Sequence, residues 1–142
     1  MPDVLTQHLE EQERQAVARY EGPVRRARTG LYWLSIYLVV LNLVVGLAGH
    51  DKVEALTQVL LGAVEGGGFL GLGVYSRKRP LISILLGAIL LFALWLYYLL
   101  FYGFNPYSGR ILTFLFLIPL LVALPAAWKL EQVITNSTAR RK

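Results

Sequence analysis

Residues 80–102 read PLISILLGAILLFALWLYYLLFY, a run of 23 residues without a single charged side chain. A helix needs about 20 predominantly apolar residues to cross the roughly 30 Å hydrocarbon core of a bilayer. Three further stretches of similar length and character lie at 30–49, 53–75 and 110–130. The sequence therefore predicts an all-α integral membrane protein with four spans, and residues 30–132 as its membrane domain.

The composition and the connectors support the same architecture. Hydrophobic residues make up 56% of the chain and charged residues only 16%, whereas an average soluble domain is about 25% charged. Short polar or turn-rich connectors at 49–52, 76–80 and 103–109 separate the four spans. Connectors this short force neighbouring helices to run antiparallel, so we expect an up-down-up-down four-helix bundle.

The basic residues are unevenly distributed among the connectors. Five arginines precede the first span, three basic residues lie between the second and third spans, and four follow from position 129 onward. The other side of the membrane receives only Lys52 and Arg110. The positive-inside rule then places both termini in the cytoplasm of a cell (inner) membrane. Juxtamembrane charge facing anionic lipid accounts for the high isoelectric point, so no nucleic-acid partner is expected.

The N-terminal residues 1–29 are polar and charged, and residues 3–20 have helical periodicity with apolar side chains on one stripe. Gly22-Pro23 is expected to end this helix, because proline removes a backbone donor. We predict a cytoplasmic amphipathic helix that lies on the inner leaflet. A docking element for a cytoplasmic partner is the alternative. Residues 133–142 are expected to form a basic cytoplasmic tail.

One acidic residue interrupts the second span, in the stretch GAVEGGGFLGLG at 62–73. Counted from Val53 at about 1.5 Å per residue, Glu65 lies roughly 18 Å deep, near the midplane of the bilayer. Counting from Gly30 brings Asn42 to a similar depth. A charged carboxylate there costs about 3 kcal/mol, so we expect Glu65 to be protonated and to donate to the Asn42 amide oxygen or to a free carbonyl.

The fourth span could provide such a carbonyl. Pro119 lies about nine residues beyond Arg110 and leaves the backbone carbonyl of Leu115 without its usual helical donor. Glu65, Asn42, Pro119 and Leu115 therefore form the candidate intramembrane polar site.

The glycines of the second span have the spacing of helix-packing motifs. Gly62 and Gly66, and then Gly67 and Gly71, each show the GxxxG spacing that allows two helix backbones to approach closely in lipid. Close packing against another helix is one interpretation. A local break in the helix that lines a cavity is the other.

Other candidate sites are weak. His50, Asp51 and Glu54 could form a weak outward-facing cation site, although a solvated turn is the preferred explanation. The chain has two histidines and no cysteine, and no HExxH motif. We therefore predict no metal centre and no cofactor. The aromatic residues near the span ends, Tyr97 and Tyr98 among them, are expected to anchor the helices at the membrane interfaces.

The stretches YWLSIYLVVLNLVVGLAG (32–49) and ALTQVLLGAVEGGG (55–68) resemble uncharacterised small bacterial inner-membrane proteins with four spans. The residues that carry the resemblance are Asn42, Thr57, Gln58, Glu65 and Gly66. The resemblance implies a four-span fold and a membrane location, and brings no activity with it.

Three classes of function fit these features. The first is an assembly or accessory protein held by glycine-mediated contacts, as a homo-oligomer or with a partner membrane protein. The second is a small oligomeric proton-coupled transporter or channel that uses Glu65 at the midplane. An enzyme acting on lipid fits less well, because one acid without a base or a metal is a minimal catalytic set.

Overall fold

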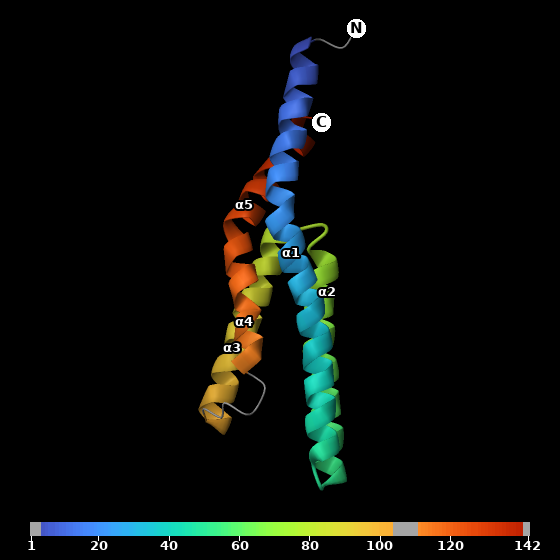
Figure 1. Ribbon diagram of the computed structural model, residues 1–142. Helices are drawn as coiled ribbons and strands as arrows, with labels where there is room; N and C mark the ends of the chain where they lie inside the picture. Colours follow the sequence, from blue (N-terminus) through green and yellow to red (C-terminus); the bar gives the residue numbers. More distant parts are fainter. Residues whose placement is uncertain (1–3, 104–110, 141–142) are drawn as a thin grey trace.

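The computed structural model describes residues 4–103 and 111–140, and their secondary structure is helical without any strand (Figure 1). The helices are α1 (Val4–Ala48), α2 (Lys52–Tyr75), α3 (Pro80–Tyr102), α4 (Ile111–Leu115) and α5 (Leu117–Arg140). Within the described residues, four helical segments are long and apolar enough to cross a membrane: α1, α2, α3 and residues 112–139. The prediction of an all-helical chain with four candidate spans is confirmed.

Helix α1 forms the centre of the molecule. Helix α2 packs along α1, and α5 packs against both α1 and α3. Figure 1 shows α1 and α2 side by side, with α3, α4 and α5 as a second group. The buried core residues on α1, α3 and α5 include Leu31, Leu34, Leu38, Ile84, Leu91, Leu120, Ala123 and Ala127. Many other large apolar side chains are exposed, such as Leu47 and Val64, which suits contact with lipid.

Helix α1 continues without interruption through Gly22 and Pro23, so the prediction that this pair ends an N-terminal helix is wrong. A proline inside a helix costs about 3 kcal/mol, because it removes a hydrogen bond and crowds the preceding turn. Val24 and Ala27, immediately beyond the proline, are fully buried, and Val17 before it packs against the same core. Burial of apolar side chains on both sides offsets the local cost and keeps the helix continuous.

The N-terminal end of α1 and the C-terminal end of α5 point toward the same end of the molecule (Figure 1). The predicted C-terminal tail is helical as far as Arg140, and it continues α5 beyond the apolar span. The ammonium of Lys129 lies 5.4 Å from the ring centroid of Tyr20 on α1. Val17 on α1 and Val133 on α5 line a common cavity of about 350 Å³. The N-terminal half of α1 therefore packs on α5, where the sequence suggested a separate surface helix.

The predicted fourth span consists of two helices, because the helix breaks between Leu115 and Leu117. The amide of Phe116 donates to the carbonyl of Thr113 at 3.1 Å, a tight turn that ends α4. Pro119 is the third residue of α5, within the first turn, where backbone N–H groups have no intrahelical partner. The proline thus lies at the start of a new helix and does not kink a continuous one.

Candidate functional site

Two buried polar side chains meet between α1 and α2. Asn42 is 0% exposed and Glu65 is 8% exposed. The amide nitrogen of Asn42 donates to Oε2 of Glu65 at 3.2 Å and to the backbone carbonyl of Leu38 at 2.9 Å. The structure therefore brings together Asn42 and Glu65, which the sequence places at a similar depth in the membrane. The direction differs from the expected one, since Asn42 donates and the Glu65 carboxyl accepts.

A third helix contributes to the same cluster. The hydroxyl of Tyr98, on α3, donates to Oε1 of Glu65 at 2.7 Å. Each oxygen of the carboxyl group therefore accepts one hydrogen bond, from Asn42 or from Tyr98. Glu65 in this way connects α1, α2 and α3 through side-chain contacts. Membrane interiors offer few alternative partners to a buried acid, so such contacts fix how the helices pack.

The sequence interpretation of Tyr98 as an interface anchor missed this role. Measured from the turn at 76–79, Glu65 is about 15 Å along α2 and Tyr98 about 27 Å along α3 at 1.5 Å per residue. Straight helices perpendicular to the membrane would leave these residues at different depths. Helix tilt and the reach of a tyrosine side chain bridge the difference, and neither can be read from the sequence.

Two glycines let α2 approach α1 closely enough for this contact. A Cβ atom at Gly62 would lie 2.6 Å from Cβ of Asn42, and one at Gly66 would lie 2.5 Å from Cγ2 of Val39 and 3.0 Å from the carbonyl oxygen of Ser35. The hydroxyl of Ser35 donates to the carbonyl of Gly66 at 2.6 Å. Any larger residue at these two positions would push the helices apart.

Gly67 and Gly71 lie on a different face of α2. A Cβ atom at either position would have no atom within 4 Å. Together with Leu70 and Val74, the two glycines line an apolar groove of about 460 Å³ that ends at Lys78. The two predicted glycine pairs thus differ in environment, because one is covered by α1 and the other is open in this chain.

The predicted position of Pro119 at this site is wrong. Pro119 lies beside Gly30, with its Cγ 3.9 Å from the position of a Cβ on that glycine. Gly30 is twelve residues from Asn42, about 18 Å along α1. Leu115 is 58% exposed, and the role of its backbone carbonyl stays a prediction. The break at Phe116 and the packing of α5 along α1 displace Pro119 from the depth that counting from Arg110 suggested.

A small cavity adjoins the cluster on the side of Tyr98. Its volume is about 20 Å³, and its lining includes Leu38, Trp95, Tyr98 and Thr113. A space of this size is sufficient for one water molecule. Thr113, on α4, is buried, so the fourth span reaches the vicinity of the site through a residue that the sequence analysis did not single out.

The predicted outer-face cation site is not formed. Asp51 is the N-cap of α2, and its Oδ1 accepts from the amide of Val53 at 3.1 Å. His50, Asp51 and Glu54 are all exposed. Across the described ranges, no three histidine or acidic side chains gather in a way that could hold a metal ion. A helix cap is the physical explanation for the acidic residue at this turn.

A second polar contact, which the sequence analysis missed, fixes the opposite end of α2. The Nε of Arg28 donates to Oγ of Ser76 at 2.8 Å, and its terminal nitrogen donates to the Ser76 carbonyl at 3.3 Å. Ser76 is fully buried and donates to the carbonyl of Gly73 at 2.7 Å. One of the basic residues that set the predicted topology thus also fastens α1 to the α2–α3 turn.

The polar cluster contains one acid whose two oxygens are both hydrogen bonded, and the described residues place no histidine or lysine beside it. Such a group can hold helices in register or exchange a proton. No family model, curated protein or solved structure matches the chain.

Proposed function

We propose that this chain is an assembly or accessory protein of the membrane, threaded up-down-up-down with both termini in the cytoplasm. In this proposal the open glycine face of α2, defined by Gly67 and Gly71, binds a transmembrane helix of a partner protein or of a second copy. The uneven distribution of basic residues supports the orientation.

The contrast between the two glycine faces carries the proposal. Glycine destabilises a helix by about 1 kcal/mol relative to alanine. Gly62 and Gly66 offset this cost by admitting α1, and so does Gly73, whose Cβ position lies 2.7 Å from Tyr32. Within the described chain nothing comparable covers Gly67 and Gly71. A second helix seated on this face would supply the missing contact, because small residues drive helix association in lipid.

The geometry of Glu65 also fits a structural role. Glu65 is 8% exposed and both of its carboxyl oxygens already have donors. A buried carboxyl that is satisfied in this way specifies the arrangement of α1, α2 and α3, and thereby the shape of the face that α2 presents.

Cysteine crosslinking in native membranes tests the proposal, because the chain has no cysteine of its own. Gly71→Cys should form a disulfide-linked or maleimide-linked adduct, whose mass distinguishes a second copy from a partner. The control is Leu85→Cys, which is exposed on α3 at a similar distance from the turn at 76–79. Equal and low crosslinking at both positions would remove the support for an interface on α2.

A second candidate function is a proton-coupled transporter or channel. The observation that favours it is the position of Tyr98, which contacts Glu65 and also borders the cavity of about 20 Å³. Water in that space would extend a path for protons from Thr113 through Tyr98 to the carboxyl. Carbodiimide labelling of Glu65 between about pH 5 and 9, with Glu65→Gln as control, together with proton flux in liposomes, tests this function. Without labelling or flux, the assembly function is the better account.

A further inference from the structure

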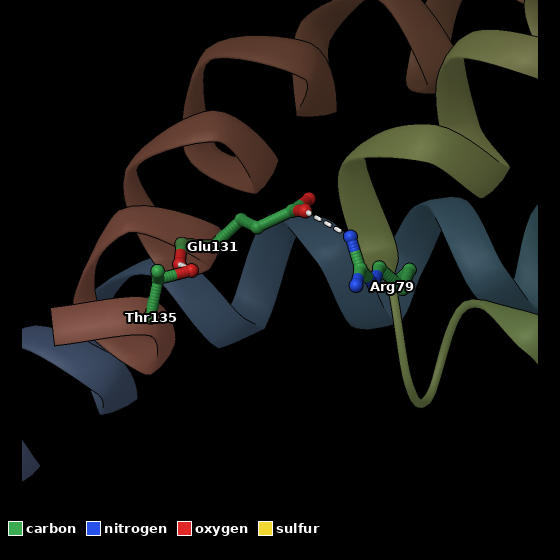
Figure 2. Close-up of polar contacts among 3 residues, drawn as sticks. All are labelled: Arg79, Glu131 and Thr135. Carbon is green, nitrogen blue, oxygen red and sulfur yellow. Dashed lines mark hydrogen bonds and ion pairs between the residues drawn. The ribbon is translucent and has the colours of Figure 1, made fainter. Parts of the chain in front are cut away.

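A cavity of about 480 Å³ lies between the α2–α3 turn and the part of α5 that extends beyond the apolar span. Figure 2 shows three residues of its lining: Arg79 from the turn faces the Glu131 carboxylate on α5, and the Thr135 hydroxyl points to the backbone carbonyl of Glu131. The volume falls in the range of small-molecule sites, about 300–1,000 Å³. The cavity adjoins the places where the apolar helices α2 and α3 meet their polar connector, which is the level of lipid headgroups in a membrane protein.

The polar side chains on one wall of this cavity are hydrogen-bond donors and not acceptors. It consists of Lys78, Arg79 and Pro80. The Arg79 side chain is 60% exposed, and its guanidinium lies 3.9 Å from Oε1 of Glu131. At that distance the two groups form an ion pair without a hydrogen bond, so the N–H groups of Arg79 remain available to a ligand. The positive end of the α3 dipole, which begins at Pro80, adds to the potential at this wall.

The opposite wall presents acceptors. Oγ1 of Thr135 donates its proton to the carbonyl of Glu131 at 2.8 Å, and Oγ1 of Thr138 donates to the carbonyl of Ile134 at 2.9 Å. Each hydroxyl then has only lone pairs left to offer. The Glu131 carboxylate also accepts, and in the described part of the chain its buried Oε2 has no hydrogen-bond partner. A buried acceptor without a donor costs about 1–3 kcal/mol.

We propose that this cavity binds the headgroup of a zwitterionic phospholipid with a primary ammonium, of the phosphatidylethanolamine type. The phosphate binds Lys78 and Arg79, and the ammonium binds Glu131 and the threonine oxygens after a small rotation of the Glu131 side chain. An anionic headgroup would leave the acceptor wall facing a negative group. A trimethylated ammonium has no N–H to donate. This inference is independent of the proposed function, because it uses neither Glu65 nor the glycine face of α2.

The test measures lipid retention by the purified full-length protein, using native mass spectrometry after exchange into phosphatidylethanolamine, phosphatidylglycerol or phosphatidylcholine with identical acyl chains. Phosphatidylethanolamine should be retained about fivefold better than the other two, since partly exposed charged contacts contribute less than buried ones. Arg79→Gln should lower retention of all three lipids. Glu131→Gln should abolish the preference and keep phosphate binding. Arg77→Gln is the matched control, a basic residue of the same turn that does not line the cavity.

Two results would overturn the inference. If Arg77→Gln lowers retention as much as Arg79→Gln, the basic turn attracts lipid without a defined site. If phosphatidylglycerol is retained as well as phosphatidylethanolamine and Glu131→Gln changes nothing, the acceptor wall has no part in binding. Lys78→Gln leaves the Arg79–Glu131 ion pair in place, so it provides the same test should Arg79→Gln fail to fold.

Discussion

The hydroxyl of Tyr98 donates a 2.7 Å hydrogen bond to Oε1 of Glu65 and thereby joins α3 to α2, two helices that otherwise pack mainly on α5 and α1. The amide of Asn42 donates a hydrogen bond to the other oxygen of the same carboxyl group. The Glu65 cluster is thus the point at which the α1–α2 pair is fixed relative to α3 by polar contacts. Substitutions that remove these contacts should therefore change how the three helices are arranged and leave the helices themselves formed.

Tyr98→Phe should destabilise the protein by about 1 kcal/mol, because interhelical hydrogen bonds in membranes contribute about 0.6 kcal/mol on average and the carboxyl oxygen would lose its donor. Thermal unfolding in detergent should show a Tm lower by about 3 °C. Tyr97→Phe is the control, since Tyr97 is the neighbouring tyrosine and 48% exposed. Equal effects of the two substitutions would contradict a specific role for the Tyr98 hydroxyl.

Gly66→Ala and Gly67→Ala should have opposite effects, although the glycines are adjacent. At Gly66 the new methyl would meet Cγ2 of Val39 at 2.5 Å and a backbone oxygen at 3.0 Å, and overpacking of this kind costs about 1–3 kcal/mol. At Gly67 the methyl has open space, and alanine should stabilise the helix by up to about 1 kcal/mol. Urea or thermal unfolding of both variants, as detergent-solubilised monomers with no second helix on the Gly67 face, checks this prediction, which a loss of stability at Gly67 would refute.

Arg28→Lys should loosen the α2–α3 turn from α1. Arg28 contacts both the hydroxyl and the carbonyl of Ser76, and an ammonium cannot reproduce the two-pronged geometry of a guanidinium. We expect faster amide hydrogen exchange at residues 76–79, with little change elsewhere. Arg25→Lys, at an exposed position one turn earlier on α1, should leave the exchange rates of the turn unchanged.

The N-terminal half of α1 should remain close to α5 in the membrane-embedded protein. Val17 and Val133 line the same cavity, so the double variant Val17→Cys/Val133→Cys should be linked by a short bismaleimide. Gln15→Cys paired with Val133→Cys should react poorly, because Gln15 is exposed on α1 and lies about 160° from Val17 around the helix. An N-terminal helix lying free on the bilayer surface would give no difference between the two pairs.

Helix ends and relative depth could be predicted wherever a short turn fixes the geometry. Helices α2 and α3 begin and end within one residue of the predicted spans. Asn42 and Glu65 lie on consecutive helices joined by a short turn, so a constant rise per residue was sufficient to place them together. The GxxxG spacing also predicted that Gly62 and Gly66 pack against another helix. The spacing alone did not distinguish these two glycines, which α1 covers, from Gly67 and Gly71, which are open in this chain.

The remaining features depend on interactions between segments distant in sequence. Pro23 locally favours the end of a helix, but the free energy gained by burying Val24 and Ala27 outweighs this preference. The position of Pro119 depends on a helix break at Phe116 and on the register of α5 against α1. The contact of Tyr98 depends on helix tilt. Hydrophobic patterns specify which face is apolar and leave these angles and offsets undetermined.

The continuity of α1 has a mechanical consequence. A helix of 45 residues is about 68 Å long, more than twice the roughly 30 Å hydrocarbon thickness of a bilayer. From Asn42 to Val4 the axis measures about 57 Å, so a tilt of about 5° at the Glu65 cluster swings the N-terminal end by about 5 Å. A small repacking at the Glu65 cluster is therefore amplified along α1, and the part of α5 that packs on the N-terminal half of α1 has to move with it.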